Sequence, residues 1–342
     1  MVSIIIVNCN GKELLNQCLG SVLKSHYSNF EAILVDNGST DESVGLAKEK
    51  YKKNPRFRII INERNLGPSA GRNRGVESAR GKYIAFLDHD TEVDPNWLKE
   101  AVGIMESDQT IGGAQCKLLL VDHRNMFDYA GDYLSQYGFL FQRVNFMEVD
   151  NGQFDEVVEL FGAKSAGMIV RQEALMNIGG FDEDYFIYME ETDLCWRMWL
   201  NNYRVIFMPT SVVYHAFGRK AKLTSPHTKF LVKYHGTKNY ITTLIKNFDT
   251  WNIIKILPIH IVLWIGIIIW HVIMGRLNEA NWITKGVLYN LTHLRSIWIK
   301  RMTIQSSVRK LSDGHIMPHI MKTQPFTYFY NKLTRPSSGW RV

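Results

Sequence analysis

The sequence predicts an α/β fold, with a mostly parallel central sheet, helices on both faces and a helical region after it. Short β-branched runs alternate with helical patterns over residues 1–107. Polar residues follow the ends of several of these runs. Beyond Phe217 the chain becomes basic and helical in pattern. We therefore expect two parts, residues 1–218 and residues 219–342.

Four strand–helix units account for the beginning of the chain. The expected strands are Val2–Val7, Ala32–Val35, Arg58–Ile61 and Tyr83–Leu87. The expected helices are Lys12–Lys24, one opened by a capping box at Ser39–Glu42 and ending at Tyr51, Gly67–Ala79, and one capped by Asp94-Pro95 that runs to Ser107. In such folds ligands bind at the carboxyl ends of the strands.

The chain between residues 116 and 160 has no clear period, and we expect short antiparallel strands and loops beside an acceptor groove. Regular patterns then return. They predict strands at Lys164–Val170, Arg204–Met208 and Val212–His215, and helices at Arg171–Ile178 and Glu190–Asn201.

The net charge of +7 conceals two oppositely charged parts. Residues 1–218 carry 21 Lys and Arg against 30 Asp and Glu, whereas residues 219–342 carry 19 against 3. A basic block at one end, interleaved with Trp, Tyr and Ile, is typical of a segment on an anionic membrane surface. No nucleic-acid recognition motif accompanies it, so we expect no nucleic-acid partner.

The C-terminal region contains a segment that is apolar enough to enter a membrane. Ile256–Gly275 has no charged residue over twenty positions, which is about the length that crosses a hydrocarbon core. Lys229–Lys246 has the pattern of a basic amphipathic helix, and Trp282–Ile299 that of an interfacial helix. A spanning or re-entrant helix, helices on the membrane surface and a soluble appendage all remain open. Residues 301–342 are basic and predicted to be rich in loops.

The four cysteines show no C-x-x-C spacing. This pattern indicates reduced thiols and a cytosolic compartment. Together with the basic apolar region, it predicts a protein on the cytoplasmic face of the cell membrane.

Two carboxylates, Asp88 and Asp90, directly follow the fourth expected strand. Alternate residues of an extended chain point the same way, so both can converge on one point. Hard oxygen ligands suit Mg²⁺ or Mn²⁺, particularly when a substrate diphosphate completes the shell. Asp is also common at an ordinary strand-to-turn junction.

Other polar residues lie at the same expected sheet edge. Asn8, Asn10 and Asp36 follow the first two strands, and Asp36 could accept hydrogen bonds from a nucleoside. Gly38 permits a tight turn there. Arg72 could contact a diphosphate or lie on a solvated helix face.

Acidic residues also cluster at the start of a later helix. Glu190, Glu191 and Asp193 are favoured there by the helix dipole, but an acidic pair after an aromatic loop could also supply a general base. His215, at a strand end, is either a third metal ligand or a structural histidine.

Taken in order, these segments resemble the family 2 glycosyltransferases, inverting enzymes of the GT-A fold that use nucleotide-sugar donors. The resemblance covers about residues 1–217 and is carried by Val2–Gly11, Val35–Asp41, Asn65–Gly75, Phe86–Asp90, Gly180–Glu183 and Glu190–Arg197. Asp193-Leu194-Cys195 and the basic C-terminal region are similar to the rhamnosyltransferase-like branch, which acts on bacterial or archaeal surface glycans.

The resemblance assigns roles to the candidate residues. Asp36 and Asp88 would bind the nucleoside in a pocket lined by Asn10 and its neighbour Asn8. Arg72 would lie near the diphosphate. Asp90, together with His215, would hold the metal. The family's acidic motif is usually Glu-Asp with Asp as the base, and Glu190-Glu191 stands in its place, so Glu191 corresponds to the base.

The predicted function is transfer of one sugar from a UDP-, dTDP- or GDP-linked donor to a hydroxyl of a lipid-linked or cell-surface glycan. The Gln-x-x-Arg-Trp motif of processive relatives is not found after the acidic motif, which disfavours a polymerase. A polyprenyl-phosphate sugar synthase of the same fold is the alternative. A non-catalytic glycan-binding protein is disfavoured because the acidic residues are present, and a nucleotidyltransferase because no G-x-G-T/S-R loop is present near the N-terminus.

Overall fold

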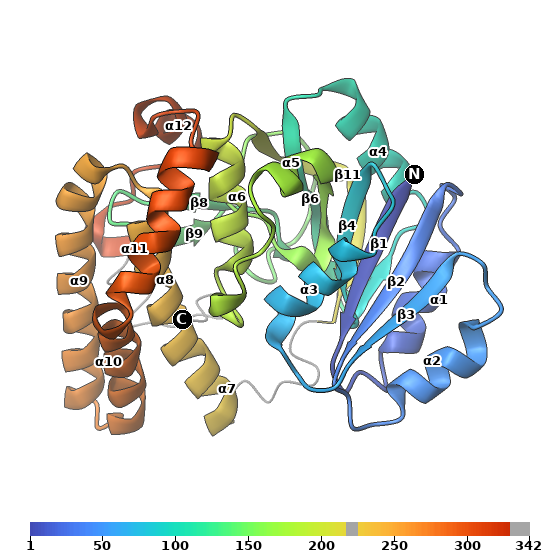
Figure 1. Cartoon of the computed structure of the whole chain (residues 1–342), viewed down its shortest axis with the longest axis horizontal. Helices are drawn as coiled ribbons and strands as arrows, with labels where there is room; N and C mark the ends of the chain where they lie inside the picture. Colours follow the sequence, from blue (N-terminus) through green and yellow to red (C-terminus); the bar gives the residue numbers. More distant parts are fainter. Residues whose placement is uncertain (217–224, 329–342) are drawn as a thin grey trace.

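The computed structural model describes residues 1–216 and 225–328. A nine-stranded sheet has helices on both faces, and a group of C-terminal helices packs at one end (Figure 1). The strand order is β3-β2-β1-β4-β10-β6-β11-β5, with β7 paired to β6. The expected boundary at residue 218 lies outside the described residues.

The first four strands are parallel, as expected. They are β1 (Val2–Asn8), β2 (Phe30–Asn37), β3 (Phe57–Asn62) and β4 (Tyr83–Asp88), connected by α1 (Leu15–Leu23), α2 (Ser43–Tyr51) and α3 (Gly67–Glu77). The register sets Asn8 opposite Asp36 and Val7 opposite Asp88. The carboxyl ends of these strands therefore share one edge of the sheet.

The other half of the sheet is mixed rather than parallel. β10 (Met168–Arg171) runs antiparallel to both β4 and β6 (Ile111–Leu120), whereas β11 (Arg204–His215) is parallel to β6. β5 (Thr91–Val93) pairs antiparallel with β11. The two strands expected within Arg204–His215 form this single strand, whose register shifts between Met208 and Val212, beside a proline that cannot donate a ladder hydrogen bond.

Short elements fill the region between β6 and α6. As expected, residues 116–160 contain short antiparallel strands, namely β7 (Phe127–Tyr129), β8 (Asp132–Leu134) and β9 (Leu140–Gln142). The remaining helices of this part are α4 (Trp97–Ser107), α5 (Gln172–Asn177), the short turns η1 (Ser165–Gly167) and η2 (Glu183–Tyr185), and α6 (Glu190–Leu200).

Three of the first four helices begin later than expected, the first of them α1, which was expected from Lys12 and begins at Leu15. α2 begins at Ser43, because the Ser39 hydroxyl donates to Asp36 in the preceding loop instead of forming a capping box, and Asp41 Oδ1 accepts from the Ser43 N–H at the start of the helix. α4 begins at Trp97, whose backbone N–H donates to the carbonyl oxygen of Asp94 in a turn before the helix.

The C-terminal helices form a layer of their own, at the left of Figure 1. They are α7 (Pro226–Phe230), the π-helical turn η3 (Leu231–His235), α8 (Gly236–Asn247), α9 (Thr250–Ile273), α10 (Leu277–Thr292), α11 (Leu294–Thr303), η4 (Ile304–Val308) and α12 (Asp313–Ile320). The expected helix Trp282–Ile299 is divided at His293, and residues 301–328 are more helical than expected.

Successive residues of β1 point to opposite faces of the sheet and enter different cores. Ile4 and Ile6 pack in one cluster with residues of α1 and α4, such as Leu19 and Trp97. The cluster on the opposite face contains Ile5 and Val7. It also includes residues from both parts of the chain, among them Leu175, Trp196, Phe207, Leu244, Phe248, Ile256, Ile304, Val308 and Ile316. The C-terminal helices thus complete one of the two cores that flank the sheet, and a third cluster, which includes Tyr240, Trp264 and Ile283, lies largely among these helices themselves.

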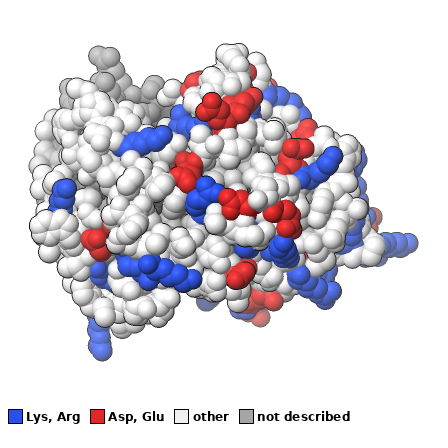
Figure 2. Space-filling model, turned by 90° about the horizontal axis from the view of Figure 1, so that it is seen from above, with Lys and Arg blue, Asp and Glu red and all other residues white. Residues whose placement is uncertain are grey.

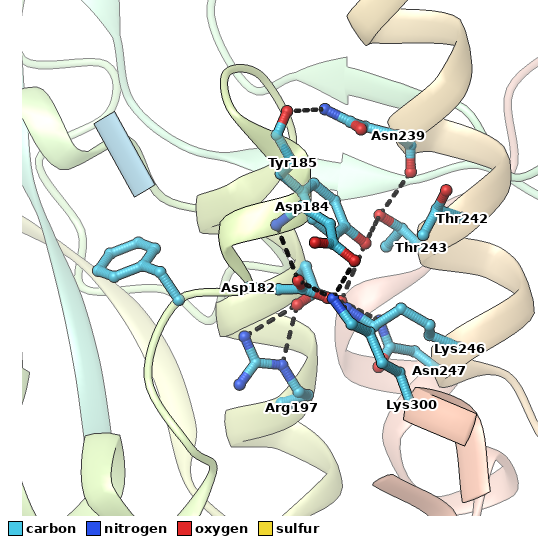
Figure 3. Close-up of polar contacts among 12 residues, drawn as sticks. Asp182, Asp184, Tyr185, Arg197, Asn239, Thr242, Thr243, Lys246, Asn247 and Lys300 are labelled. Carbon is cyan, nitrogen blue, oxygen red and sulfur yellow. Dashed lines mark hydrogen bonds and ion pairs between the residues drawn. The ribbon is translucent and has the colours of Figure 1, made fainter. Parts of the chain in front are cut away.

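A buried group of charged and polar side chains lies between α6 and α8 (Figure 3), and we call it the α6–α8 cluster. Lys246 on α8 is 1% exposed, and its Nζ lies 2.5 Å from Asp182 Oδ2 and 3.0 Å from Asp193 Oδ1. Arg197 pairs with Asp193 Oδ2 through Nε at 2.9 Å and Nη2 at 2.8 Å. Lys300 on α11 bonds Asp182 as well. Charge pairing therefore joins the C-terminal helices to the sheet-bearing part.

Candidate active site

A pocket of about 730 Å³ opens at the carboxyl edge of the sheet. Its walls come from the ends of β1 and β4, the segment before α6, the end of β11, and α8. Seven predicted site residues line it: Asn10, Arg72, Asp88, Asp90, Glu190, Glu191 and His215. The structure thus brings together residues that are as much as 205 positions apart in the sequence.

Asp88, Asp90 and His215 form a group that could hold a metal ion. One ligand atom from each lies within 4.8 Å of the others. The proximity follows from the topology, because β11 pairs with β5 directly after the Asp88–Asp90 turn and the Ala216 N–H donates to the Asp90 carbonyl oxygen at 2.9 Å. Two carboxylates and an imidazole fit Mn²⁺ or Mg²⁺ as a donor set.

Asp128 orients the imidazole and was not predicted from the sequence. His215 Nε2 lies 3.4 Å from Asp90 Oδ1, and Nδ1 lies 2.9 Å from Oδ2 of the buried Asp128. A carboxylate behind the second ring nitrogen is the usual arrangement around a metal-binding histidine. Burial alone would lower the pKa of His215. The carboxylates of Asp90 and Asp128 outweigh this effect and raise the pKa to about 10. Metal binding would displace this proton.

Asn8 and Asp36 lie behind the pocket wall. Asp36 is 2% exposed, and its Oδ1 accepts hydrogen bonds from Asn8 Nδ2 at 2.8 Å and from Ser39 Oγ. These two hydrogen bonds fix the loop that contains Gly38. Gly38 has a φ of +72°, and a Cβ atom at this position would lie only 2.5 Å from the carbonyl carbon of Arg64. The Asn10 side chain accepts from the Thr40 N–H at 2.8 Å. Nucleoside contacts by Asn8 and Asp36 stay predictions.

Arg72 joins the two acidic motifs. Its guanidinium is buried and donates to Glu190 Oε1 at 2.9 Å and to Asp88 Oδ1 at 3.3 Å, and it lies 3.7 Å from Glu191 Oε1. Burial lowers its pKa, but the three carboxylates, Glu191 first, raise it above the ordinary value. Arg72 is therefore not on a solvated helix face, and its charge offsets the repulsion between the carboxylates.

Glu190 and Glu191 occupy different environments. Glu190 is 2% exposed, and no hydrogen-bond partner in the described chain reaches its Oε2. Burial, together with the Glu191 carboxylate, raises the pKa of Glu190 to about 8. The Glu191 side chain is 17% exposed, and its Oε1 accepts from Ser165 Oγ at 2.6 Å. Ser165, also missed by the sequence analysis, thus orients the more accessible carboxylate.

The segment before α6 has an unusual backbone and is supported by α8. Phe186, Tyr188 and Met189 have φ values of 60°, 68° and 67°, which cost free energy for residues other than glycine. Asn239 Nδ2 on α8 donates to three carbonyl oxygens of this segment: Tyr185 at 3.0 Å, Ile187 at 2.8 Å and Tyr188 at 2.7 Å. Figure 3 shows Asn239 beside Tyr185. These bonds hold the turn from which Glu190 and Glu191 start α6.

The C-terminal helices also form part of the pocket wall. Val232, Gly236 and Tyr240 line it, opposite the sheet edge. No sequence pattern pointed to them, because nothing in a single helix identifies which remote pocket it will cover.

Two family profiles match the chain. Glycosyl transferase family 2 matches residues 3–120, and Glycosyl transferase family group 2 matches residues 83–277, more than half of the chain. An uncharacterized glycosyltransferase of Haemophilus influenzae is 38% identical over 105 residues, which cover 31% of this chain and 42% of that relative.

Two solved structures share the fold. GalNAc-T7 with UDP, GalNAc and Mn²⁺ superposes with a TM-score of 0.58 and 19% identity, covering 73% of this chain and 48% of the other. The mannosyltransferase PcManGT of Pyrobaculum calidifontis, with GDP-Man and Mn²⁺, superposes with a TM-score of 0.55 and 15% identity. The match covers 90% of this chain and 85% of the other. At these identities the likeness concerns the fold alone. The sheet, the converging carboxylates and the profile matches lead to one conclusion: the chain is a glycosyltransferase of family 2 with a GT-A fold.

Proposed function

We propose that this glycosyltransferase is metal-dependent and inverting, and that it moves one sugar from a nucleoside diphosphate donor to a hydroxyl of a lipid-linked or cell-surface glycan. The observation that carries the proposal is the single pocket in which Asp88, Asp90 and His215 face Glu191. This arrangement supports a cation site for a diphosphate beside a carboxylate able to accept a proton.

The donor side of the proposal rests on the three-residue metal group. Asp90 and His215, with Asp88 beside them, would hold Mn²⁺ or Mg²⁺. That ion would neutralise the charge that develops on the departing diphosphate. GalNAc-T7 is in complex with UDP and Mn²⁺, and PcManGT with GDP-Man and Mn²⁺, which supports a nucleotide-sugar donor here. The base and sugar, including the rhamnosyltransferase-like branch, remain to be determined.

We assign the role of general base to Glu191. Both glutamates line the pocket, but the Glu191 side chain is 17% exposed, whereas Glu190 is buried and bonded to Arg72. An acceptor hydroxyl attacks the anomeric carbon and passes its proton to Glu191. The bond between that carbon and the diphosphate oxygen breaks on the opposite face, and a single displacement of this kind inverts the anomeric centre.

The acceptor side of the proposal follows from the C-terminal helices. Leu140, Val232 and Tyr240 give the pocket an apolar section. α9 is the one described helix that is long and apolar enough to cross a membrane. We therefore place the enzyme at the cytoplasmic face of the cell membrane, with an acceptor attached to that membrane.

A nucleotide panel tests the donor site. The intact protein is heated with UDP, dTDP or GDP, with and without Mn²⁺, and the matching nucleoside serves as the control. We expect one diphosphate to raise Tm only when Mn²⁺ is present, because binding to the folded state alone stabilises it by mass action. Absence of a shift with all three nucleotides would contradict the donor site.

The base is tested by two matched substitutions. Glu191→Gln should lower kcat by about 10²–10⁴-fold with donor affinity unchanged. Glu190→Gln should leave most of kcat, and the exposed Glu49→Gln is the control. Turnover is measured as nucleoside diphosphate release. An active Glu191→Gln beside an inactive Glu190→Gln would move the base to Glu190. Near-normal activity of both would favour a phosphate acceptor, which needs no strong base.

A further inference from the structure

α9 is apolar on both of its faces. Its inner face is buried and contains Ile256, His260, Trp264, Ile267 and His271. Its outer face is exposed and equally apolar, with Ile254 62% exposed, Val262 65%, Ile265 47%, Ile269 53% and Ile273 72%. A helix on the surface of a water-soluble domain normally shows polar residues on its outer side. Only 28% of the apolar window of α9 is buried, so the outer face is not part of the described core.

The charges around this outer face favour an anionic surface. Lys255 lies near the start of α9 and Arg276 just after its end, and both are exposed. Of the six Lys and Arg in residues 250–303, four are exposed: Lys255, Arg276, Lys285 and Arg295. The one acidic residue of this range, Glu279, is partly buried and lies 3.7 Å from Lys229 Nζ. In Figure 2 most Asp and Glu side chains lie at the centre and right, whereas the left part is mostly white with scattered Lys and Arg. Such a surface fits anionic lipid headgroups.

The ends of the face have the residue types that mark a membrane interface. Trp251, in the first turn of α9, is 72% exposed. Trp is favoured at the headgroup level because its ring is apolar and its N–H is polar. Met274 and Leu277, 48% and 64% exposed, extend the apolar face past the other end of the helix. A continuous apolar face of this length is uncommon on a soluble monomer.

The inner face fixes how α9 can meet a membrane. His260 Nδ1 lies 2.9 Å from the carbonyl oxygen of Tyr137, and Trp264 Nε1 donates to His260 Nε2 at 2.9 Å. Phe139 packs against His260 with ring centroids 4.2 Å apart. If α9 crossed the bilayer with these contacts intact, the non-helical backbone around Tyr137 would enter the hydrocarbon, which excludes irregular backbone exposed to lipid.

We infer that α9 lies in the plane of an anionic lipid bilayer, with its outer face inserted below the headgroups and its inner face attached to the enzyme. The sequence left open a spanning or re-entrant helix, helices on the membrane surface and a soluble appendage. The contacts of the inner face favour a helix on the membrane surface over a spanning helix. The inference deepens the proposed membrane attachment and rests on it, but it does not rest on the proposed chemistry.

Vesicle binding of the full-length protein tests the surface. Flotation is measured with phosphatidylcholine vesicles with and without 30% phosphatidylglycerol. We expect the anionic vesicles to bind more protein, and Val262→Glu/Ile269→Glu to weaken that binding at least 10-fold. The matched control is Val157→Glu/Met176→Glu, which alters residues 56% and 66% exposed outside the helical region. Equal vesicle binding of the two double variants would overturn the proposal. A wild-type protein that does not bind vesicles, and that light scattering shows to dimerise through this face, would overturn it as well.

Insertion depth distinguishes a flat helix from a spanning one. Single cysteines at Ile254, Val262 and Ile273 carry an environment-sensitive dye in a Cys9→Ser background, because the other three native cysteines are buried. Quenching by lipids spin-labelled at known depths should give similar shallow depths at all three sites. A spanning helix would instead place Ile254 and Ile273 near opposite surfaces, with Val262 deep. The rise in Tm that the nucleoside diphosphate causes is also measured for Val262→Glu/Ile269→Glu, because it reports on the donor site and not on the membrane surface. It therefore distinguishes failure of this inference from failure of the donor site.

Discussion

The sheet-bearing part and the C-terminal helices use their charges in opposite ways. In the first, the carboxylates of Asp88, Asp90 and Glu191 converge on a pocket. In the second, much of the positive charge points inward. Lys246 and Lys300 bond acidic residues of the first part, and Arg301 Nη1 donates to the carbonyl oxygens of Ile245 and Phe248. The opposite net charges of the two parts are therefore partly internal complementarity.

This difference changes the meaning of the basic C-terminal region. From composition alone its charge was assigned to a membrane surface. Among the described residues, some of this charge is exposed around α9, whereas Lys246 and Lys300 fasten α8 and α11 to α6 and the loop before it. The same helices supply Tyr240 to the pocket and Asn239 to the segment before the acidic motif. We propose that the helical region is a structural component of the active site as well as a membrane attachment.

The largest expected effect comes from breaking the α6–α8 cluster. Lys246→Met leaves Asp182 and Asp193 without their shared buried cation, and removing one partner of a buried ion pair costs about 3–5 kcal/mol. Urea unfolding at pH 7 should show this loss of free energy of unfolding. The exposed Lys99→Met is the control, and we expect it to change stability by less than about 0.5 kcal/mol. A Lys246→Met protein as stable as Lys99→Met would mean that the helices are a loosely attached appendage.

The pH dependence of that loss checks its electrostatic origin. Burial alone would raise the pKa of both Asp182 and Asp193. Lys246 and its neighbouring cations outweigh this effect and lower both pKa values below the ordinary value of 3.8. The stabilisation is therefore present above pH 3.8 and disappears as the pH falls through the folded-state pKa values. The cost of Lys246→Met should stay constant from pH 7 to about pH 4 and shrink as the pH falls below 3.8. A cost that does not depend on pH would indicate lost packing instead.

A smaller effect is expected from Asn239, which acts on the site from the helical side. Asn239→Ala removes three hydrogen bonds to the Tyr185–Tyr188 backbone, so the acidic motif should shift. A misplacement of about 1 Å can cost up to about 10²-fold in rate, and we expect kcat to fall about 10–100-fold while donor affinity is kept. Thr242→Ala, on the same helix but bonded to Asn290, is the control. Equal kcat losses in the two variants would indicate general weakening of α8 rather than positioning.

The sequence was most informative where local pattern and topology agree. Continuous β-branched and apolar runs predicted β1 to β4 and therefore the edge at which Asp88 and Asp90 converge. β6 was not expected, because Gly112 and Gly113 weaken its strand pattern. Asp128 was missed because it lies in a stretch without periodicity. Ser165 was missed because a strand was expected over Lys164–Val170, whereas residues Ser165–Gly167 form a short turn before β10. Each of the two acts only through a contact with a remote residue.

The acidic motif shows the same limit in another form. The sequence shows two adjacent glutamates but not that Arg72, more than a hundred residues earlier, bonds Glu190 and leaves Glu191 the more exposed of the two. Their division into a buried and an accessible carboxylate is a property of the tertiary structure alone.

Binding of Mn²⁺ tests the central claim most directly. Electron paramagnetic resonance follows free Mn²⁺ as the intact protein is titrated in the presence of the nucleoside diphosphate that raises Tm. We predict one bound ion per chain, at least 10-fold weaker binding in Asp90→Asn and in His215→Ala, and a loss of about 10–100-fold in Asp128→Asn, which removes only the group that orients His215. Unchanged Mn²⁺ affinity in Asp90→Asn and His215→Ala would show that the cation binds elsewhere.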